Sequence, residues 1–287
     1  MRFARKNDGA DLRVRHGKVR AAVLVLIVLI VLAASAAAKG WPTPAGGRST
    51  SGGPEVLFTF DDGPNPTTTP KVLDILAKHH IKAVFFMVGE MVDTQNKKVP
   101  AIIERILREG HVIANHTMQH KDLCRTKTTL EAAIADIDDG RTAIEKVAAV
   151  PMVWFRAPFG VRCDRLDELL AERGIEHFHW DLDPQEWKHG DKTKTVTYVT
   201  GSLARSSDRN VLLMHDIKPV TVAALPEILA WLDAENAKRT KANQKPIRIL
   251  QAPELAIEQL PAGLVAFVRD TTKRLRGLRG DLVSVLP

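Results

Sequence analysis

From residue 54 onward, short apolar runs alternate with longer amphipathic stretches. The apolar runs, rich in Val, Ile, Leu and Phe, predict seven buried strands at 56–60, 83–88, 112–115, 153–156, 177–181, 211–215 and 247–250. The stretches between them predict helices at 69–79, 100–109, 129–147, 165–173, 195–206 and 222–238. Alternating strands and helices imply right-handed crossovers and a parallel sheet. This pattern predicts an α/β fold, a distorted (β/α)7-type barrel that forms one domain over residues 55–260.

The start of the chain has a different character. Residues 1–38 contain seven basic and two acidic residues, which account for +5 of the formal net charge of +7. An apolar core at 22–32 precedes the small residues Ala34, Ser35 and Ala36, a pattern typical of a cleaved signal peptide. The whole apolar stretch is also just long enough to be a retained signal anchor. Both interpretations predict an extracytoplasmic domain, in the periplasm or at the cell surface, with membrane contact through this segment if it is uncleaved.

Two further segments flank the predicted domain. Residues 39–54 are rich in Gly, Pro and Ser, which predicts a flexible linker. Residues 261–287 carry several basic residues and predict a C-terminal helical extension with a solvated face. Because the chain after residue 38 has a net charge of only +2, general binding to phosphate backbones is disfavoured, and we expect no nucleic acid partner.

Polar clusters follow five of the predicted strands. They are Asp61 with Asp62, His116 with His120, Arg156, the segment 181–186, and His215. The carboxyl ends of parallel strands meet at one rim of a barrel, and that rim is where sites are assembled. We therefore expect these side chains to lie together.

The two histidines have a spacing that suits metal binding. Four residues apart, His116 and His120 are predicted to lie on one face of a helical turn, within reach of one ion. Asp62 would complete a three-ligand site that leaves one position open for water. Taken alone, the Asp61–Asp62 pair is more often a solvated turn than a functional site, and the histidine pair is more often a surface feature than a pair of ligands.

Five ordered motifs carry a resemblance to a known family. They are TFDDG at 59–63, HTMQH at 116–120, RAPF at 156–159, DPQEW at 183–187 and LMH at 213–215. In this order they resemble the motifs of the polysaccharide deacetylases, also called carbohydrate esterase family 4 or the NodB homology domain, over about residues 54–250. The resemblance implies a barrel hydrolase that uses one divalent metal ion, Zn²⁺ first of all, with Co²⁺ or Ni²⁺ as substitutes.

The resemblance also implies roles for the matching polar residues. Asp61 would act as general base toward the hydrolytic water, and Arg156 would orient that base. Asp62, His116 and His120 would bind the metal ion.

Other matching residues would contact the acetyl group or the leaving group. Phe159 stands where the family usually has Tyr, and its backbone N–H would help to hold the oxyanion, a function that survives this change of side chain. Trp187 and Leu213 would form the pocket for the acetyl methyl group. His215 would act as general acid.

Glu186 departs from the family pattern, which usually has Asp immediately before the tryptophan. In the family that acid tunes the catalytic histidine, and the extra methylene of Glu changes its reach. Asp183 and Asp181 are therefore alternatives for the same task.

The chain has two cysteines, Cys124 after the histidine motif and Cys163 after the arginine motif. Both are expected on rim loops of strands that could be neighbours, and an even number outside the cytoplasm permits a disulfide. The alternative is two unpaired buried thiols.

The residue types also indicate the chemistry. Amide hydrolysis needs an activated water, stabilisation of an oxyanion and a proton for the departing amine. The sequence has no Gly-x-Ser-x-Gly motif, which argues against a serine esterase. We therefore expect deacetylation of a GlcNAc-containing polysaccharide, with peptidoglycan favoured by the expected location. Chitooligosaccharides and O-acetylated polysaccharides are alternative substrates, and a non-catalytic sugar-binding module or a membrane-tethered scaffold are rival classes.

Overall fold

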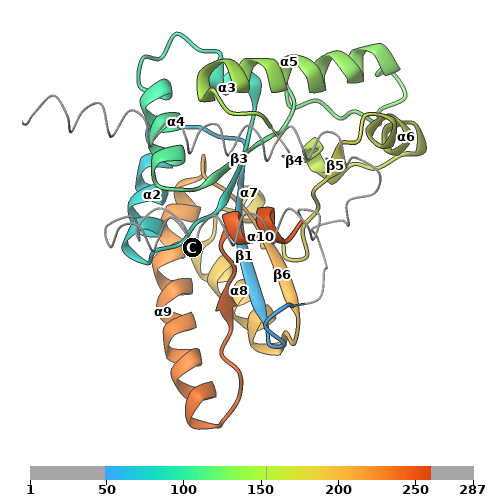
Figure 1. Ribbon diagram of the computed structural model, residues 1–287. Helices are drawn as coiled ribbons and strands as arrows, with labels where there is room; N and C mark the ends of the chain where they lie inside the picture. Colours follow the sequence, from blue (N-terminus) through green and yellow to red (C-terminus); the bar gives the residue numbers. More distant parts are fainter. Residues whose placement is uncertain (1–48, 153, 260–287) are drawn as a thin grey trace, which may run out of the picture.

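The structure, a computed structural model, describes residues 49–152 and 154–259 (Figure 1). The predicted signal segment at 1–38, most of the predicted linker and the predicted extension at 261–287 lie outside the described residues. No helix among the described residues is both long and apolar enough to cross a membrane.

The described residues form one parallel sheet of seven strands. The strands are β1 (Glu55–Asp61), β2 (Val84–Met87), β3 (Val112–Asn115), β4 (Trp154–Phe155), β5 (Glu176–His177), β6 (Arg209–His215) and β7 (Arg248–Ile249). Their order is β5-β4-β3-β2-β1-β6, and β7 pairs with β1. Each predicted strand therefore has a counterpart in the sheet.

The sheet curls until its two edges meet. After β5 the chain leaves β4 and reaches β6, where Leu182 forms a parallel bridge with Leu212. The backbone N–H of Asp181 donates to Val211 O at 2.9 Å, and that of Leu213 donates to Leu182 O at 2.9 Å. The two residues Asp181 and Leu182 therefore close the barrel between β5 and β6. The predicted distorted (β/α)7-type barrel is confirmed, and a short contact replaces a full strand at the closure.

All six predicted helices are present. They are α2 (Thr69–Lys78), α4 (Val99–Arg108), α5 (Leu130–Ala148), α6 (Asp164–Glu172), α8 (Lys192–Arg205) and α9 (Pro219–Lys241). Helix α9 begins three residues before its predicted start, because Pro219 at the first helical position has a backbone angle suited to a helix start. The short helices that the sequence did not predict are α3 (Gly89–Val92), the 3₁₀ turn η1 (Pro158–Gly160), α7 (Glu186–His189) and α10 (Ala252–Glu258).

Alternation along β1 determines which residues face the barrel interior. Val56, Phe58 and Phe60 pack with the apolar side chains of the surrounding helices. Leu57 packs instead with interior residues of the other strands. Because side chains of a strand alternate between two faces, Thr59 and Asp61 lie on the interior side with Leu57. The last residue of β1 therefore projects into the mouth of the barrel.

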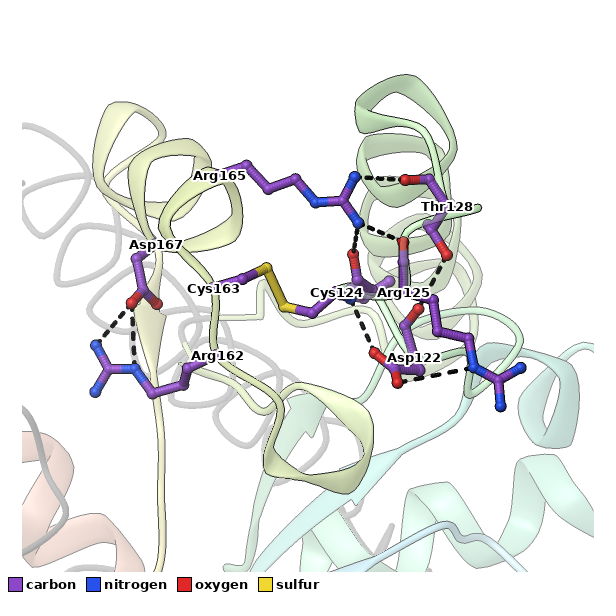
Figure 2. Close-up of a disulfide and its surroundings, with 9 residues drawn as sticks. Asp122, Cys124, Arg125, Thr128, Arg162, Cys163, Arg165 and Asp167 are labelled. Carbon is purple, nitrogen blue, oxygen red and sulfur yellow. Dashed lines mark hydrogen bonds and ion pairs between the residues drawn. A yellow bond between two sulfur atoms is a disulfide. The ribbon is translucent and has the colours of Figure 1, made fainter.

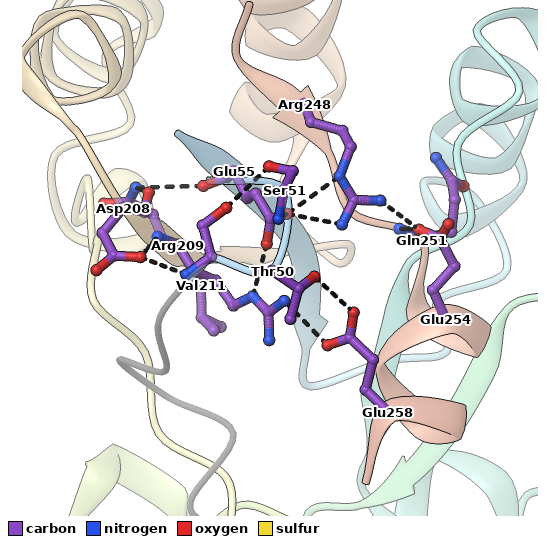
Figure 3. A network of polar contacts seen from close by, with 12 residues as sticks. Thr50, Ser51, Glu55, Asp208, Arg209, Val211, Arg248, Gln251, Glu254 and Glu258 are labelled. Carbon is purple, nitrogen blue, oxygen red and sulfur yellow. Dashed lines mark hydrogen bonds and ion pairs between the residues drawn. The ribbon is translucent and has the colours of Figure 1, made fainter. Parts of the chain in front are cut away.

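An ionic network lies at the opposite, amino-terminal end of the strands (Figure 3). Glu55, at the start of β1, is fully buried. Its carboxylate accepts from Arg209 Nε at 2.8 Å and from Arg248 Nη2 at 2.7 Å. The described end of the expected linker contacts this network: Ser51 N donates to Glu55 at 3.3 Å, and Thr50 Oγ1 donates to Glu258 at 2.9 Å. This region joins β1, β6, β7 and α10 far from the rim that carries the polar motifs.

Candidate metal centre and active site

The polar motifs meet at the carboxyl-terminal rim of the barrel. Asp61 and His215 are the last residues of β1 and β6, and they are neighbours in the strand register. His116 follows β3 directly, and Arg156 follows β4 directly. The parallel strand arrangement therefore brings together residues that are far apart in the sequence, as the sequence predicted.

Three of these residues form a cluster that could hold a metal ion. Asp62 Oδ1 lies 3.5 Å from His116 Nε2 and 3.0 Å from His120 Nε2. Potential ligand atoms of the three residues all lie within 4.8 Å of one another. Asp62 Oδ1 is buried and has no hydrogen-bond partner among the described residues. A buried carboxylate oxygen facing two imidazole nitrogens is a donor set that suits a divalent transition metal.

The protonation states of the cluster also suit a cation. His116 Nδ1 lies 2.7 Å from the carbonyl oxygen of Arg156, so Nδ1 carries the proton and Nε2 keeps its lone pair facing Asp62. Burial works against ionisation of Asp62, but its close contacts with His116 and His120 outweigh burial and hold the pKa of Asp62 well below its usual range. Metal binding requires an ionised carboxylate, and this arrangement favours one.

The two histidines are brought together in an unexpected way. The prediction that they share one face of a helical turn was wrong, because the segment is irregular and Thr117 and His120 have φ angles of 68° and 52°. The backbone N–H of Thr117 donates to Asn115 Oδ1, and that of His120 donates to Thr117 Oγ1, both at 3.0 Å. These side-chain acceptors stabilise a turn in which both imidazoles point at Asp62.

Arg156 lies beneath the site and binds Asp61. The guanidinium is completely buried, and its Nη1 donates to Asp61 Oδ1 at 2.6 Å and to Thr59 Oγ1 at 3.0 Å. Its Nε donates to the carbonyl oxygen of Phe178 at 2.8 Å, and its Cζ atom lies 4.0 Å from the centre of the Phe86 ring. With one oxygen bound in this way, Asp61 presents its other oxygen 3.7 Å from His116 Nε2.

Glu186 is the carboxylate that binds His215. Glu186 Oε1 accepts from His215 Nδ1 at 2.9 Å, from His215 N at 2.8 Å and from Thr221 Oγ1 at 3.2 Å. Burial lowers the pKa of His215, but the hydrogen bond and negative charge of Glu186 outweigh burial and raise it. The longer side chain of Glu therefore reaches the histidine from the first residue of α7.

The two alternative acids have other partners. Asp181 Oδ2 accepts from the backbone N–H of Val211 on β6 at 2.7 Å. Asp183 Oδ1 accepts from the backbone N–H of Gln185 at 2.8 Å and thereby supports the turn before α7. Burial raises the pKa of Asp183. Both side chains support the backbone around Glu186, and the contact with His215 belongs to Glu186.

Two aromatic residues are exposed beside the site. Phe159 is 66% exposed, and its ring centre lies 4.7 Å from that of His120. Trp187 is 49% exposed, and its ring centre lies 6.5 Å from that of His215. Leu213 is buried in β6, two residues before His215. Phe159 has a φ of 61°, an unusual backbone angle for a bulky side chain that is typical of functional positions.

Sequence reasoning missed two buried residues that support the site. Thr221, in the first turn of α9, donates to Glu186 as described above. Asp216, next to His215, is completely buried and accepts from Thr69 Oγ1. Burial raises the pKa of Asp216 to about 7. A Cβ atom on Gly63 would lie 2.3 Å from Asp216 Oδ2, so Asp216 packs closely against the turn that carries Asp62. The position of Asp216 beside a strand-end histidine was the available signal.

A disulfide joins two loops of the rim (Figure 2). It links Cys124, in the loop after the histidine motif, to Cys163, immediately before α6. Arg165 on α6 strengthens the same connection by donating to the carbonyl oxygens of Thr128 at 2.6 Å and Arg125 at 2.7 Å. The loop that follows the candidate metal ligands is therefore tied to the loop that follows Arg156.

Reducing this disulfide is expected to lower the free energy of unfolding by about 2–4 kcal/mol, because the bond restricts the unfolded chain over a separation of 39 residues. Urea unfolding with and without a phosphine reductant measures the difference. The Cys124→Ser, Cys163→Ser double variant is the control, and its unfolding should not respond to reductant. Finding two free thiols in unreduced, denatured protein would contradict this prediction.

Comparisons with known proteins agree on one family. A sequence model of the family described as polysaccharide deacetylase matches residues 48–178. A chitooligosaccharide deacetylase from Sinorhizobium fredii is 36% identical over 202 residues, which cover 68% of this chain and 84% of the relative. A peptidoglycan-N-acetylglucosamine deacetylase from Bacillus cereus is 37% identical over 182 residues, which cover 62% of this chain and 81% of the relative. The solved structure of the peptidoglycan deacetylase PdaC from Bacillus subtilis matches with a TM-score of 0.59 at 28% identity, over 80% of this chain and 99% of that one.

Proposed function

This chain belongs to the polysaccharide deacetylase family, and we propose on that premise that it removes N-acetyl groups from a GlcNAc-containing polysaccharide, with peptidoglycan as the favoured substrate. The observation that carries the proposal is the joint placement of Asp62, His116 and His120, with Asp61 close to His116 and His215 close to Asp62. The reaction adds water across the amide C–N bond and gives acetate and a free amine.

One divalent cation would be held by Asp62, His116 and His120. Two imidazoles and one carboxylate are the ligand set of many hydrolytic zinc sites, which favours Zn²⁺ and allows Co²⁺ or Ni²⁺ as substitutes. Such an ion, when bound, supplies Lewis acidity that lowers the pKa of water and polarises the amide carbonyl.

The protein's own groups move the protons. Asp61, held by Arg156 through one oxygen, accepts the proton of the attacking water on its other oxygen. His215 donates a proton to the departing nitrogen from Nε2, because Glu186 binds its Nδ1–H and leaves Nε2 directed toward Asp62, 4.0 Å away. The backbone N–H of Phe159 would stabilise negative charge on the carbonyl oxygen.

The surroundings of the site suit a polymer. Phe159 and Trp187 are exposed beside the candidate ligands, so sugar rings can stack on them without first entering a closed cavity. The disulfide supports an extracytoplasmic location, where peptidoglycan is found, as does the apolar segment near the start of the chain. Anchoring to the membrane would follow if that segment is retained.

Chitooligosaccharides are the second candidate substrate, because the relative from Sinorhizobium fredii has almost the same identity to this chain as the relative from Bacillus cereus. An O-acetylated polysaccharide would be hydrolysed by the same groups. A non-catalytic sugar-binding module is disfavoured by the presence of base, acid and ligand side chains together.

The test is acetate release from three substrates by the full chain: peptidoglycan, chitooligosaccharides and acetylated xylan. We expect release from peptidoglycan that stops when a chelator removes the metal and returns when Zn²⁺ is added. Faster release from chitooligosaccharides would reassign the substrate. Acetate release that ignores the chelator, or no release from any of the three with stoichiometric Zn²⁺ bound, would overturn the proposed function.

A further inference from the structure

The segment His116–His120, called here the histidine loop, has a backbone that its own sequence does not favour. Thr117 and His120 both have positive φ, although neither is glycine. Conformations of this kind cost free energy and persist only where the surrounding structure imposes them. Contacts outside the loop must therefore fix the direction in which its two imidazoles point.

Helix α5 makes such contacts through one buried carboxylate. Asp136 is 7% exposed, and its Oδ1 accepts from the backbone N–H of Gln119 at 2.7 Å. The carbonyl oxygen of the same residue accepts from the backbone N–H of Met118 at 2.7 Å. Two consecutive amide groups between the two histidines thus bind a single residue. Asn115, just before the loop, also donates to α5, from its Nδ2 to the carbonyl oxygen of Ile137 at 2.9 Å.

Gly140 allows the loop to approach α5 this closely. A Cβ atom at Gly140 would lie 2.4 Å from the carbonyl carbon of Thr117 and 2.6 Å from the nitrogen of Met118, which are backbone atoms that cannot rotate away. Glycine in the interior of a helix is unfavourable by about 1 kcal/mol relative to alanine. Its presence within the 19-residue helix α5 is explained by this approach.

The loop also contacts α3, which lies beside α5 (Figure 1). The backbone N–H of Gly89 donates to Thr117 O at 2.9 Å, and a Cβ atom at Gly89 would lie 3.0 Å from the Cα of Gly140. An open groove of about 630 Å³ adjoins the loop and is lined by Met118, Gln119 and Asp136 among others. The hydrogen bonds from Met118 N and Gln119 N to Asp136 therefore add to the close packing of the loop against α3 and α5.

We propose that Asp136 and Gly140 are positioning residues for the metal centre, which set the convergence of His116 and His120 on Asp62. This inference rests on the proposed metal-dependent function. Neither residue touches the ion or the substrate. Groups that orient the first ligands of a metal typically contribute about 10- to 100-fold to its affinity.

The test measures Zn²⁺ affinity without substrate, by competition of the full chain with a chromophoric chelator. We expect Asp136→Ala to weaken Zn²⁺ binding by about 10- to 100-fold. Asp136→Asn should weaken it by only about threefold, because the amide oxygen can still accept from Gln119 N. Gly140→Ala should weaken it as well. The visible spectrum of the Co²⁺-loaded protein should change in Asp136→Ala, since it reports the geometry of the ligands.

Two matched controls separate positioning from general effects on α-helices. Asp139→Asn places the same substitution on an exposed residue of α5. Gly201→Ala places alanine in α8, where the nearest atom to the new Cβ is Arg205 Nη1 at 3.5 Å. Both controls should bind Zn²⁺ as the wild type does. Near-ultraviolet circular dichroism of each metal-free variant shows whether it is folded.

The outcomes are decisive in each case. Folded Asp136→Ala with wild-type Zn²⁺ affinity and an unchanged Co²⁺ spectrum overturns the inference. Where Asp136→Ala does not fold, Asp136→Asn decides: weaker Zn²⁺ binding supports the inference, and wild-type affinity overturns it. Because no substrate is present, a wild type that binds Zn²⁺ but releases no acetate would overturn the proposed function alone.

Discussion

Replacing Asp61 by Asn is expected to lower the rate of acetate release by about 10²- to 10⁴-fold, the usual contribution of a general base. The amide keeps an oxygen that can accept from Arg156 Nη1, which lies 2.6 Å from Asp61 Oδ1, so the site remains filled. The amide lacks the negative charge of the carboxylate and therefore cannot accept a proton from water. The loss should therefore fall mainly on kcat.

Zn²⁺ content and melting temperature, measured on the same samples, give this prediction its controls. Arg156 is buried and loses its counter-ion in Asp61→Asn, so some loss of stability is expected, whereas stoichiometric Zn²⁺ should remain. Asp233→Asn, on an exposed position of α9, should leave acetate release unchanged. A Zn²⁺-loaded Asp61→Asn variant that keeps more than about a tenth of the wild-type rate would show that another group is the base.

Replacing Glu55 by Gln is expected to lower the free energy of unfolding by about 3–5 kcal/mol, because it removes the fully buried anion to which two arginines donate, and Arg209 and Arg248 then keep only Glu258 and Glu254 as partners. Arg209 is 8% exposed, and both it and Arg248 donate to Glu55 (Figure 3). Urea unfolding monitored by circular dichroism measures the loss. Glu227→Gln removes an exposed carboxylate paired with Lys192 and should cost less than about 1 kcal/mol.

The same network predicts how stability depends on pH. Burial works against ionisation of Glu55, but hydrogen bonds from Arg248 and Arg209 outweigh it and lower the pKa from 4.5 to about 2. The stabilisation is therefore complete above pH 4.5 and is lost as the pH falls toward 2. Glu55→Gln should lack this part of the acid dependence. If the two proteins lose stability in parallel between pH 4.5 and 2, Glu55 is not the group responsible.

The sequence predicted the longer strands β1, β2, β3 and β6 well because each is an apolar run with no helical period. It predicted the composition of the site because polar residues stand at the ends of those runs, as Asp61 does in β1 and His215 in β6. These features depend only on local composition and on the geometry of parallel strands. They can therefore be recognised without knowledge of the tertiary contacts.

Features set by tertiary contacts could not be predicted in this way. The two histidines have the spacing of a helical turn, but contacts with Asp136 and Gly140 determine the backbone conformation of the histidine loop. These two residues come at least sixteen residues later in the chain. The strand predicted at 177–181 is only two residues long, because the chain leaves β4 after His177 to reach β6. Glu186 was one of three candidate acids, and only the position of α7 selects it.

The closure of the barrel at Leu182 has a further consequence. The same stretch of chain that fastens β5 to β6 continues, four residues later, into Glu186 and its bond to His215. The closure of the barrel and the position of Glu186 beside His215 therefore depend on one short path of backbone. A change that loosens the contact between Leu182 and Leu212 is expected to displace Glu186 and with it the hydrogen bond to His215.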